Sequence, residues 1–178
     1  MTSSLVGSEM CIRDRYLDRF DILYKEDNTI KDSKEVRSYL QSKKKKLFSY
    51  EIFENLDLSK GNYEELEFQF SSFVGCNFTQ SSWNKSHLLF SNLQNTMLKN
   101  TKMEKMKIFD TDFSGATLEQ VDFAGAKIKH VSFAGAKLIQ VDFSKVLLAE
   151  EINFQDAQIV DCKFPEEVGS GLLYHENR

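Results

Sequence analysis

The sequence contains few residues that interrupt secondary structure or form covalent cross-links, and no segment that could span a membrane. It has a single proline, Pro165, three cysteines among 178 residues, and no apolar run of membrane-spanning length. This composition suits one domain with capping elements, and binding to or crossing of a membrane is not expected. Apart from Cys11, the cysteines Cys76 and Cys162 fall in distant repeats, so we expect neither a disulfide nor a metal site. Free cysteines favour the cytoplasm.

Charge and histidine are too evenly spread to indicate chemistry. Residues 66–166 contain twelve acidic and ten basic side chains, so this segment is nearly neutral, which argues against a strongly DNA-like surface. His87, His130 and His175 have no metal-ligand spacing to one another or to the cysteines. No nucleophile elbow occurs, and no glycine-rich stretch has the context of a phosphate loop. We therefore predict no enzyme activity, no catalytic, cofactor-binding or metal-binding residues, and no small-molecule substrate.

The sequence does contain a large apolar side chain at every fifth position from Phe68 to Leu148. On a helix, residues five apart rotate to different faces, and on a flat strand they alternate between two sides, so neither continuous element fits. A chain that bends once per repeat can aim all of these side chains at one axis. The predicted core ladder contains Phe73, Phe78, Trp83, Phe113, Leu118, Phe123, Ile128, Phe133, Leu138 and Phe143.

A second column supports this inward orientation. Two residues before the large side chains stand small or slim ones, such as Cys76, Thr101 or Ala126, with Met106 and Ile152 as exceptions. A spacing of two puts both residues on the same side of an extended segment. From Phe113 to Phe143, phenylalanine alternates with leucine or isoleucine. This ten-residue super-period indicates an even number of sides.

The stretches 116–120 (ATLEQ) and 121–125 (VDFAG) resemble the motif A(D/N)LXX of the pentapeptide-repeat proteins. The resemblance covers residues 51–164. It implies an all-β solenoid, namely a right-handed quadrilateral β-helix of about five coils with four pentapeptides in each coil. Residues twenty apart then stack at strand spacing, roughly 4.8 Å.

One step departs from the regular spacing. Leu148 and Phe154 are six residues apart, and the five-residue spacing resumes after them. This step predicts a bulge of one residue near Ala149, Glu150 and Glu151. The simplest interpretation is an insertion tolerated at a corner.

The two ends of the chain differ in sequence from the repeat segment. Residues 1–15 resemble the in-frame translation of a sequencing adapter, so we expect an artefact there and a native N-terminus that is missing. Residues 16–50 lack the five-residue spacing and carry helix signals such as Asp32 followed by Glu35. They are predicted to form a helical cap over the open end of the solenoid, and residues 165–178 a C-terminal cap or tail.

Outward aromatic residues form the most informative surface feature. Phe70 and Phe90 lie twenty residues apart at positions that face outward, with Leu89 and Phe109 beside them. An outward apolar patch of this kind is either covered by another segment of the chain or used for binding, so two interpretations stay open. The patch binds a protein partner or a second copy, or the N-terminal helix covers it. The side chains available for that cover include Phe20, Val36 and Leu40.

A run of four lysines closes the predicted helix: Lys43, Lys44, Lys45 and Lys46. One interpretation is a solvated helix end, where positive charge suits the helix dipole. The other is a contact for nucleic acid or an anionic lipid surface. No aromatic or arginine side chain accompanies the run, which favours the solvated helix end.

Three functions remain. The missing catalytic constellation and the outward cluster favour a non-enzymatic scaffold that presents flat faces to an unknown protein partner. The resemblance implies an alternative, because some pentapeptide-repeat proteins mimic duplex DNA and modulate DNA gyrase and other type II topoisomerases. The third function is binding of an anionic membrane or nucleic acid through the lysine run.

Overall fold

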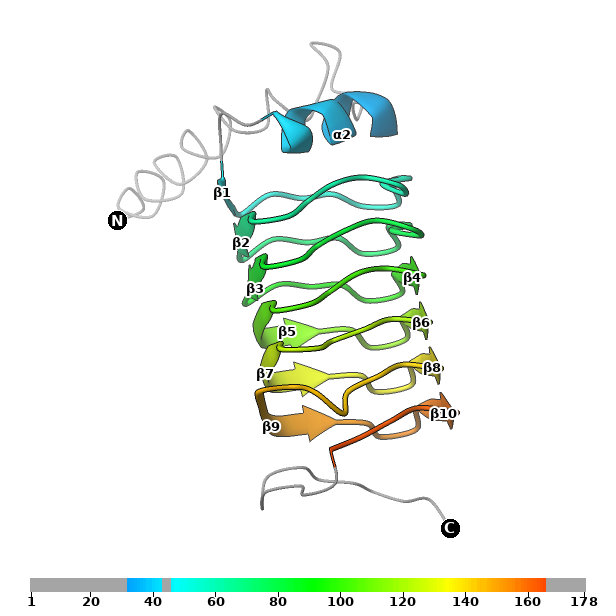
Figure 1. Ribbon diagram of the computed structural model, residues 1–178. Helices are drawn as coiled ribbons and strands as arrows, with labels where there is room; N and C mark the ends of the chain where they lie inside the picture. The colour runs from blue at the N-terminus through cyan, green and yellow to red at the C-terminus, as the bar shows by residue number, and fades with distance from the viewer. Residues whose placement is uncertain (1–31, 43–45, 166–178) are drawn as a thin grey trace, which may run out of the picture.

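The computed structural model describes residues 32–42 and 46–165 (Figure 1). In this part of the chain one helix, α2 (Ser33–Gln41), precedes a stack of parallel strands. The larger sheet has six strands, in the order β1 (Leu47–Ser49), β2 (Glu67–Gln69), β3 (His87–Leu89), β5 (Lys107–Asp112), β7 (Lys127–Ser132) and β9 (Leu148–Asn153). The smaller sheet has four strands, in the order β10 (Gln158–Val160), β8 (Lys137–Ile139), β6 (Thr117–Glu119) and β4 (Met97–Lys99).

Strand pairing repeats every twenty residues. Phe48 aligns with Phe68, which in turn aligns with Leu88, and isolated bridges on the other sides keep the same offset. Four pentapeptides therefore make one coil, and the predicted all-β solenoid is confirmed. The larger sheet has six strands where about five coils were expected. The difference arises because the first coil starts at Leu47 rather than at residue 51, with the ring of Phe48 stacked on that of Phe68 at 5.1 Å.

The chain bends at every fifth residue, where the backbone enters the left-handed region. Phe70 and Phe90 have φ of 51°, Gln80 of 60° and Gly115 of 69°. Short strands run between such corners, so the five-residue spacing in the sequence is the distance from one corner to the next. Glycine adopts this conformation without strain, but most of the corners hold larger residues.

The core is a stack of side chains along the solenoid axis. All ten members of the predicted core ladder are buried, with at most 3% of any side chain exposed. Rings stack between coils: Phe113 lies 5.2 Å from Phe133, and Phe123 lies 4.9 Å from Phe143. Some rings also meet edge to face within a coil, as between Phe133 and Phe143 at 5.9 Å. Both geometries are favourable for aromatic pairs.

The slim inner column is mostly polar up to Thr111 and apolar after it. Thr101 Oγ1 donates to the Phe78 carbonyl oxygen at 2.9 Å, and Thr111 Oγ1 donates to the Phe109 carbonyl oxygen at 2.9 Å. A buried hydroxyl that donates to a carbonyl avoids most of the penalty of losing water. Val131 follows Thr111 in this column, since β5 and β7 pair at these two residues. Either a methyl or a hydroxyl group therefore fits the column.

The two cysteines in the described residues, Cys76 and Cys162, differ in solvent exposure. Cys76 belongs to the inner column, with its Sγ 3.0 Å from the Phe53 carbonyl oxygen, and burial raises the pKa of its thiol to about 12. Cys162 is half-buried, and burial raises its pKa as well. Neither forms a disulfide. Because the thiolate is the reactive species, Cys76 should be the less reactive of the two.

Alkylation with iodoacetamide at pH 8 should therefore modify Cys162 at least about tenfold faster than Cys76. Peptide mass spectrometry at timed intervals measures the two rates separately. In denaturant the two rates should converge. Equal rates in the native protein would show that the coil around Cys76 opens readily.

The extra residue lies earlier than the sequence suggested. The amide of Phe123 donates to the carbonyl of Asp142, an offset of 19 as in earlier coils, whereas the amide of Gly125 donates to the carbonyl of Lys145, an offset of 20. From Leu148 onward, β9 pairs with β7 at an offset of 21 instead of the usual 20. The insertion therefore falls in the corner before Leu147, whose side chain is 71% exposed, and not at residues 149–151. A corner can absorb a residue because β9 then keeps its full pairing with β7. As a result Ala149, rather than Leu148, aligns with the core residue of β7.

Helix α2 covers the N-terminal end of the stack (Figure 1). Asp32 caps it by accepting from the amides of Lys34 and Glu35, each at 2.9 Å. Val36 and Leu40 are each 1% exposed and join the core cluster that contains Phe48. They do not cover Phe70 and Phe90, so that expectation is wrong for them, while Phe20 lies outside the described residues. The open end of an aromatic core offers more apolar area than an outer corner, and this explains where the helix packs.

No helix within residues 32–42 and 46–165 is long and apolar enough to cross a membrane.

Candidate interaction surface

Three aromatic residues stack on the outside of the solenoid at one corner. Tyr50, Phe70 and Phe90 occupy this corner in three successive coils, and we name them the aromatic corner. Neighbouring ring centroids lie 5.0 Å apart with interplanar angles of 8°. The side chains are 47%, 47% and 53% exposed, respectively. Phe70 and Phe90 were predicted from the sequence and Tyr50 was not, although its position twenty residues before Phe70 is a usable signal.

The aromatic corner is held in an unfavourable backbone conformation. Tyr50, Phe70 and Phe90 have φ of 59°, 51° and 51°. A left-handed residue with a bulky side chain costs roughly 1–2 kcal/mol. Stacking of exposed rings returns about 0.5–1.5 kcal/mol for each of the two pairs, which does not exceed the cost at the three corners. Folding alone therefore gives little reason for aromatic residues here, where other corners hold glycine, asparagine or charged residues.

Further apolar side chains surround the aromatic corner. Leu89 and Phe109 lie next to it on the outer face of β3 and β5, where they are aligned with each other and half-buried. Leu47 and Ile52 flank Tyr50 in the first coil and are 46% and 38% exposed. Of the nine exposed large apolar side chains in the described residues, five gather here. A cluster of this kind marks a binding surface more often than scattered apolar residues do.

In the C-terminal coils, the residues at this same corner are charged or titratable. After Phe90 come Asp110, His130 and Glu151. His130 Nδ1 lies 3.1 Å from Asp110 Oδ1, and His130 Nε2 lies 3.2 Å from Glu151 Oε1. The sequence did not join His130 to these carboxylates, because the link to Glu151 depends on the inserted residue. The corner thus changes from apolar to acidic along the rod.

The lysine run is only partly within the described residues. Lys43, Lys44 and Lys45 lie outside them, so the predicted anionic contact stays a prediction there. Lys46 Nζ lies 3.2 Å from Glu65 Oε2, and the hydrogen bond and charge of Lys46 lower the pKa of that carboxyl group. Lys46 therefore already has an anionic partner within the protein.

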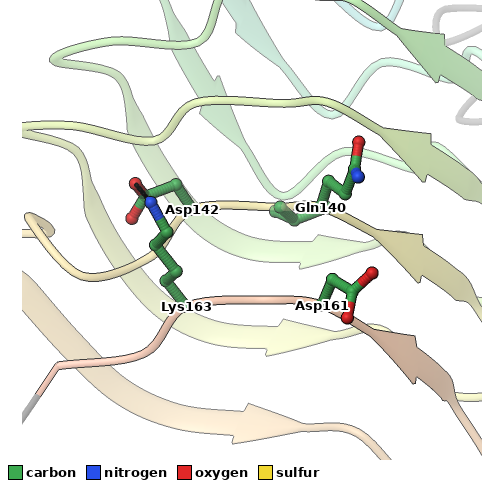
Figure 2. Close-up of a pocket in the computed structure, with 5 residues that line it drawn as sticks. Gln140, Asp142, Asp161 and Lys163 are labelled. Atoms are coloured by element: carbon green, nitrogen blue, oxygen red, sulfur yellow. Dashed lines mark ion pairs between the residues drawn. The ribbon is translucent and has the colours of Figure 1, made fainter.

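An open groove lies between the last two coils (Figure 2). It has a volume of about 420 Å³ and is lined by Gln140, Val141, Asp142, Asp161 and Lys163. Lys163 extends toward Asp142 of the previous coil, with Nζ 3.8 Å from Oδ2 (Figure 2). Burial opposes ionisation of Asp142, but hydrogen bonds from the Ser144 hydroxyl and amide hold its pKa below the ordinary value. These residues form an ion pair and a capped turn, which are structural roles.

No group of three or more histidine, cysteine, aspartate or glutamate side chains in residues 32–42 and 46–165 could hold a metal ion. The aromatic corner with its acidic continuation is therefore the strongest candidate for a functional site in this part of the chain.

Comparisons with known proteins agree with the fold. Residues 77–154 match a family model described as a pentapeptide repeat region. A comparison with curated proteins finds no match. One similar solved structure is a trypsin-treated variant of QnrB1, a plasmid-mediated fluoroquinolone resistance protein, with a TM-score of 0.58 and 19% identity over 67% of this chain. The alignment spans 60% of the QnrB1 chain, which is less than two thirds of that protein.

A second similar structure is the pentapeptide repeat protein Rfr23 from the cyanobacterium Cyanothece 51142. Its TM-score is 0.56, with 16% identity over 72% of this chain and 97% of Rfr23. At these identities the likeness concerns the fold. The five-residue repeat, the four-sided solenoid and the family match over residues 77–154 together show that this chain contains a pentapeptide repeat region.

Proposed function

We infer that this protein is a non-enzymatic scaffold that binds a protein partner through the aromatic corner. The observation that carries this proposal is the pair Phe70 and Phe90, which are about half exposed, stacked at 5.0 Å and held at φ of 51°. Exposed aromatic side chains are the commonest energetic anchors of protein interfaces. A corner that accepts smaller residues elsewhere has no structural need for them.

The solenoid suits a scaffold because it holds these rings in place before binding. Each coil is hydrogen-bonded to the next through parallel pairing, and the core rings stack beneath the surface. Little conformational entropy remains for the aromatic corner to lose on binding, since neighbouring rings already restrain one another. The free Cys76 and Cys162 favour a reducing compartment, so we place this function in the cytoplasm.

Capture from cell extract tests the proposal. Immobilised full-length protein should retain a partner that the double variant Phe70→Asn, Phe90→Asn retains at least about tenfold less, because hot-spot aromatics dominate interface energies. Asparagine is chosen because Asn55, Asn95 and Asn100 already occupy corners with positive φ. The matched control is Met97→Ala, which removes an apolar side chain that is 42% exposed on the smaller sheet.

Retention of the same proteins by the wild type and the asparagine variant would contradict an interaction through this corner. Equal circular dichroism spectra and equal denaturation midpoints would first establish that the variant is folded. Loss of capture in the Met97→Ala variant as well would indicate nonspecific apolar adsorption.

Modulation of a type II topoisomerase such as DNA gyrase is the second candidate. The fold likeness to the fluoroquinolone resistance protein QnrB1 supports it. The charges do not favour duplex DNA mimicry, because acidic and basic residues pair across coils, as in Lys99 with Glu119 at 3.0 Å and Lys163 with Asp142 at 3.8 Å. A gyrase supercoiling assay with and without a fluoroquinolone tests it. Unchanged activity in both arms removes this candidate.

A further inference from the structure

We propose that the partner docks on the aromatic corner as an amphipathic α-helix whose axis runs along the solenoid. Its apolar turns pack against Tyr50, Phe70 and Phe90, and its following turns carry basic side chains toward Asp110 and Glu151. This inference rests on the scaffold function above and specifies the chemistry of the partner.

The spacing of the rings selects a helix over a strand. The centroids of the aromatic corner repeat every 5.0 Å along the rod. An α-helix presents a side chain on one face about every 5.4 Å, so three helical turns stay in step with three coils. A strand presents a side chain on one face about every 6.6 Å, which is out of step by about 3 Å after two repeats. Only the helix can seat each apolar residue against a ring of the ladder.

The size of the patch also fits a single helix. Three rings of about 200 Å² each, roughly half exposed, offer on the order of 300 Å². The exposed parts of Leu47 and Ile52 add a smaller area beside Tyr50. A stable interface between two globular surfaces buries about 800 Å² on each partner. The apolar area is therefore too small for a globular partner or a second copy alone, and it matches one face of a short helix.

The charges at this corner determine the orientation of the partner helix along the solenoid. Asp110 and Glu151 follow the rings at the same corner, and both lie against a single histidine, His130. Lys129 and Glu150 beside them neutralise each other at 3.0 Å. The corner column thus holds two carboxylates against one histidine, so its net charge is negative.

Other charges near this column do not reverse its sign. Lys107 and Lys127 lie at the start of β5 and β7, separated from the corner by the column of Phe109 and Lys129. Across the corner, Asp112 adds a further carboxylate that is hydrogen-bonded to Gln94. Basic residues of the partner helix therefore belong at the C-terminal half of the rod, and its apolar residues at the end covered by α2.

A selection experiment tests this inference. The probe is a phage library of random 18-residue peptides, selected on immobilised full-length protein with counter-selection on the Phe70→Asn, Phe90→Asn variant. The expected result is enrichment of sequences with apolar residues at positions i, i+3 or i+4, and i+7, followed by arginine or lysine one to three turns later. Enrichment of alternating, period-two sequences would overturn the helix, and so would the absence of enrichment over the variant.

A synthetic peptide of the most enriched sequence, labelled with fluorescein, provides the second measurement. Fluorescence anisotropy should show affinity weakened at least tenfold by Phe90→Asn and about three- to tenfold by Asp110→Asn with Glu151→Gln. The second loss should shrink in 0.5 M salt, where exposed charges are screened. Met97→Ala should bind as the wild type does. Equal binding of a version with proline at its centre would contradict helical docking.

Other occupants of the aromatic corner are outcomes of the same tests. If sedimentation shows a dimer that Phe90→Asn dissociates, the occupant is a second copy. If Phe20→Asn increases peptide binding at least tenfold, the occupant is the chain's own N-terminal segment. Either result overturns the partner helix. If capture from extract still depends on Phe70 and Phe90 while the library yields no helical pattern, the scaffold function stands and only this inference fails.

Discussion

Replacement of Phe133 by alanine is expected to lower the free energy of unfolding by about 3–5 kcal/mol. Phe133 is fully buried, stacks on Phe113 at 5.2 Å and Phe154 at 5.4 Å, and meets Phe143 edge to face at 5.9 Å. Alanine would leave a cavity that the solenoid cannot close, because hydrogen bonds to both neighbouring coils fix the backbone spacing. The loss is a large share of the stability of an ordinary domain.

Urea denaturation followed by circular dichroism and by fluorescence of Trp83 measures this loss. Trp83 is the single tryptophan and is 1% exposed, so its emission reports opening of the N-terminal half. The matched control is Phe90→Asn, which should change stability by less than about 1 kcal/mol because lost stacking and relieved backbone strain nearly cancel. A loss below about 1.5 kcal/mol for Phe133→Ala would mean that the core collapses to fill the space.

An aspartate at position 131 should destabilise the protein by a similar or larger amount, at least about 3–5 kcal/mol. Val131 is 1% exposed in the slim inner column, where the aligned Thr111 donates to a backbone carbonyl oxygen. A carboxylate can only accept hydrogen bonds, and carbonyl oxygens cannot donate them. The donors that this column offers are single backbone amides, such as that of Ser71 to Ser91 Oγ at 3.4 Å. One such bond does not offset the burial of a full charge.

The control for this prediction is Val131→Thr. Thr111 occupies the aligned position in the previous coil and donates to the carbonyl oxygens of Leu88 at 3.3 Å and Phe109 at 2.9 Å. A threonine at 131 has equivalent acceptors, so it should lie within about 1 kcal/mol of the wild type. Denaturation midpoints of the two variants should separate clearly. Similar midpoints would show that water reaches the inner column.

The pH dependence of Val131→Asp provides a further check. Burial would raise the pKa of the new carboxyl group above its unfolded value of about 3.9. Its deficit relative to the wild type should therefore be complete above the folded pKa and should vanish as the pH falls below the unfolded one. A deficit that does not change with pH would point to a steric cause.

The aromatic corner and the core have separate roles in this arrangement. Core rings hold the coils together, while Phe70 and Phe90 stand at corners that tolerate asparagine, so binding can be altered without unfolding the protein. This separation makes the scaffold proposal testable with folded variants. It also explains why the same rod can carry an apolar surface in one half and charges in the other.

The five-residue spacing alone was sufficient to predict the core and the architecture. It placed Phe113, Phe123 and Phe133 inside, where they are buried, because bending once per repeat leaves one direction that avoids water. The twenty-residue relation between Phe70 and Phe90 likewise predicted their outer stack. The five-residue and twenty-residue spacings are regular along the chain, so the order of the side chains is sufficient to predict what depends on them.

Only the tertiary structure decided where irregular parts belong. The packing of α2 on the end of the core, the position of the insertion before Leu147, and the contact of His130 with both Asp110 and Glu151 each depend on competition between distant surfaces. A helix packs where the most apolar area is available, and an inserted residue lies where it breaks the fewest hydrogen bonds between coils. Neither comparison can be made along the chain, because the competing surfaces exist only once the coils have stacked.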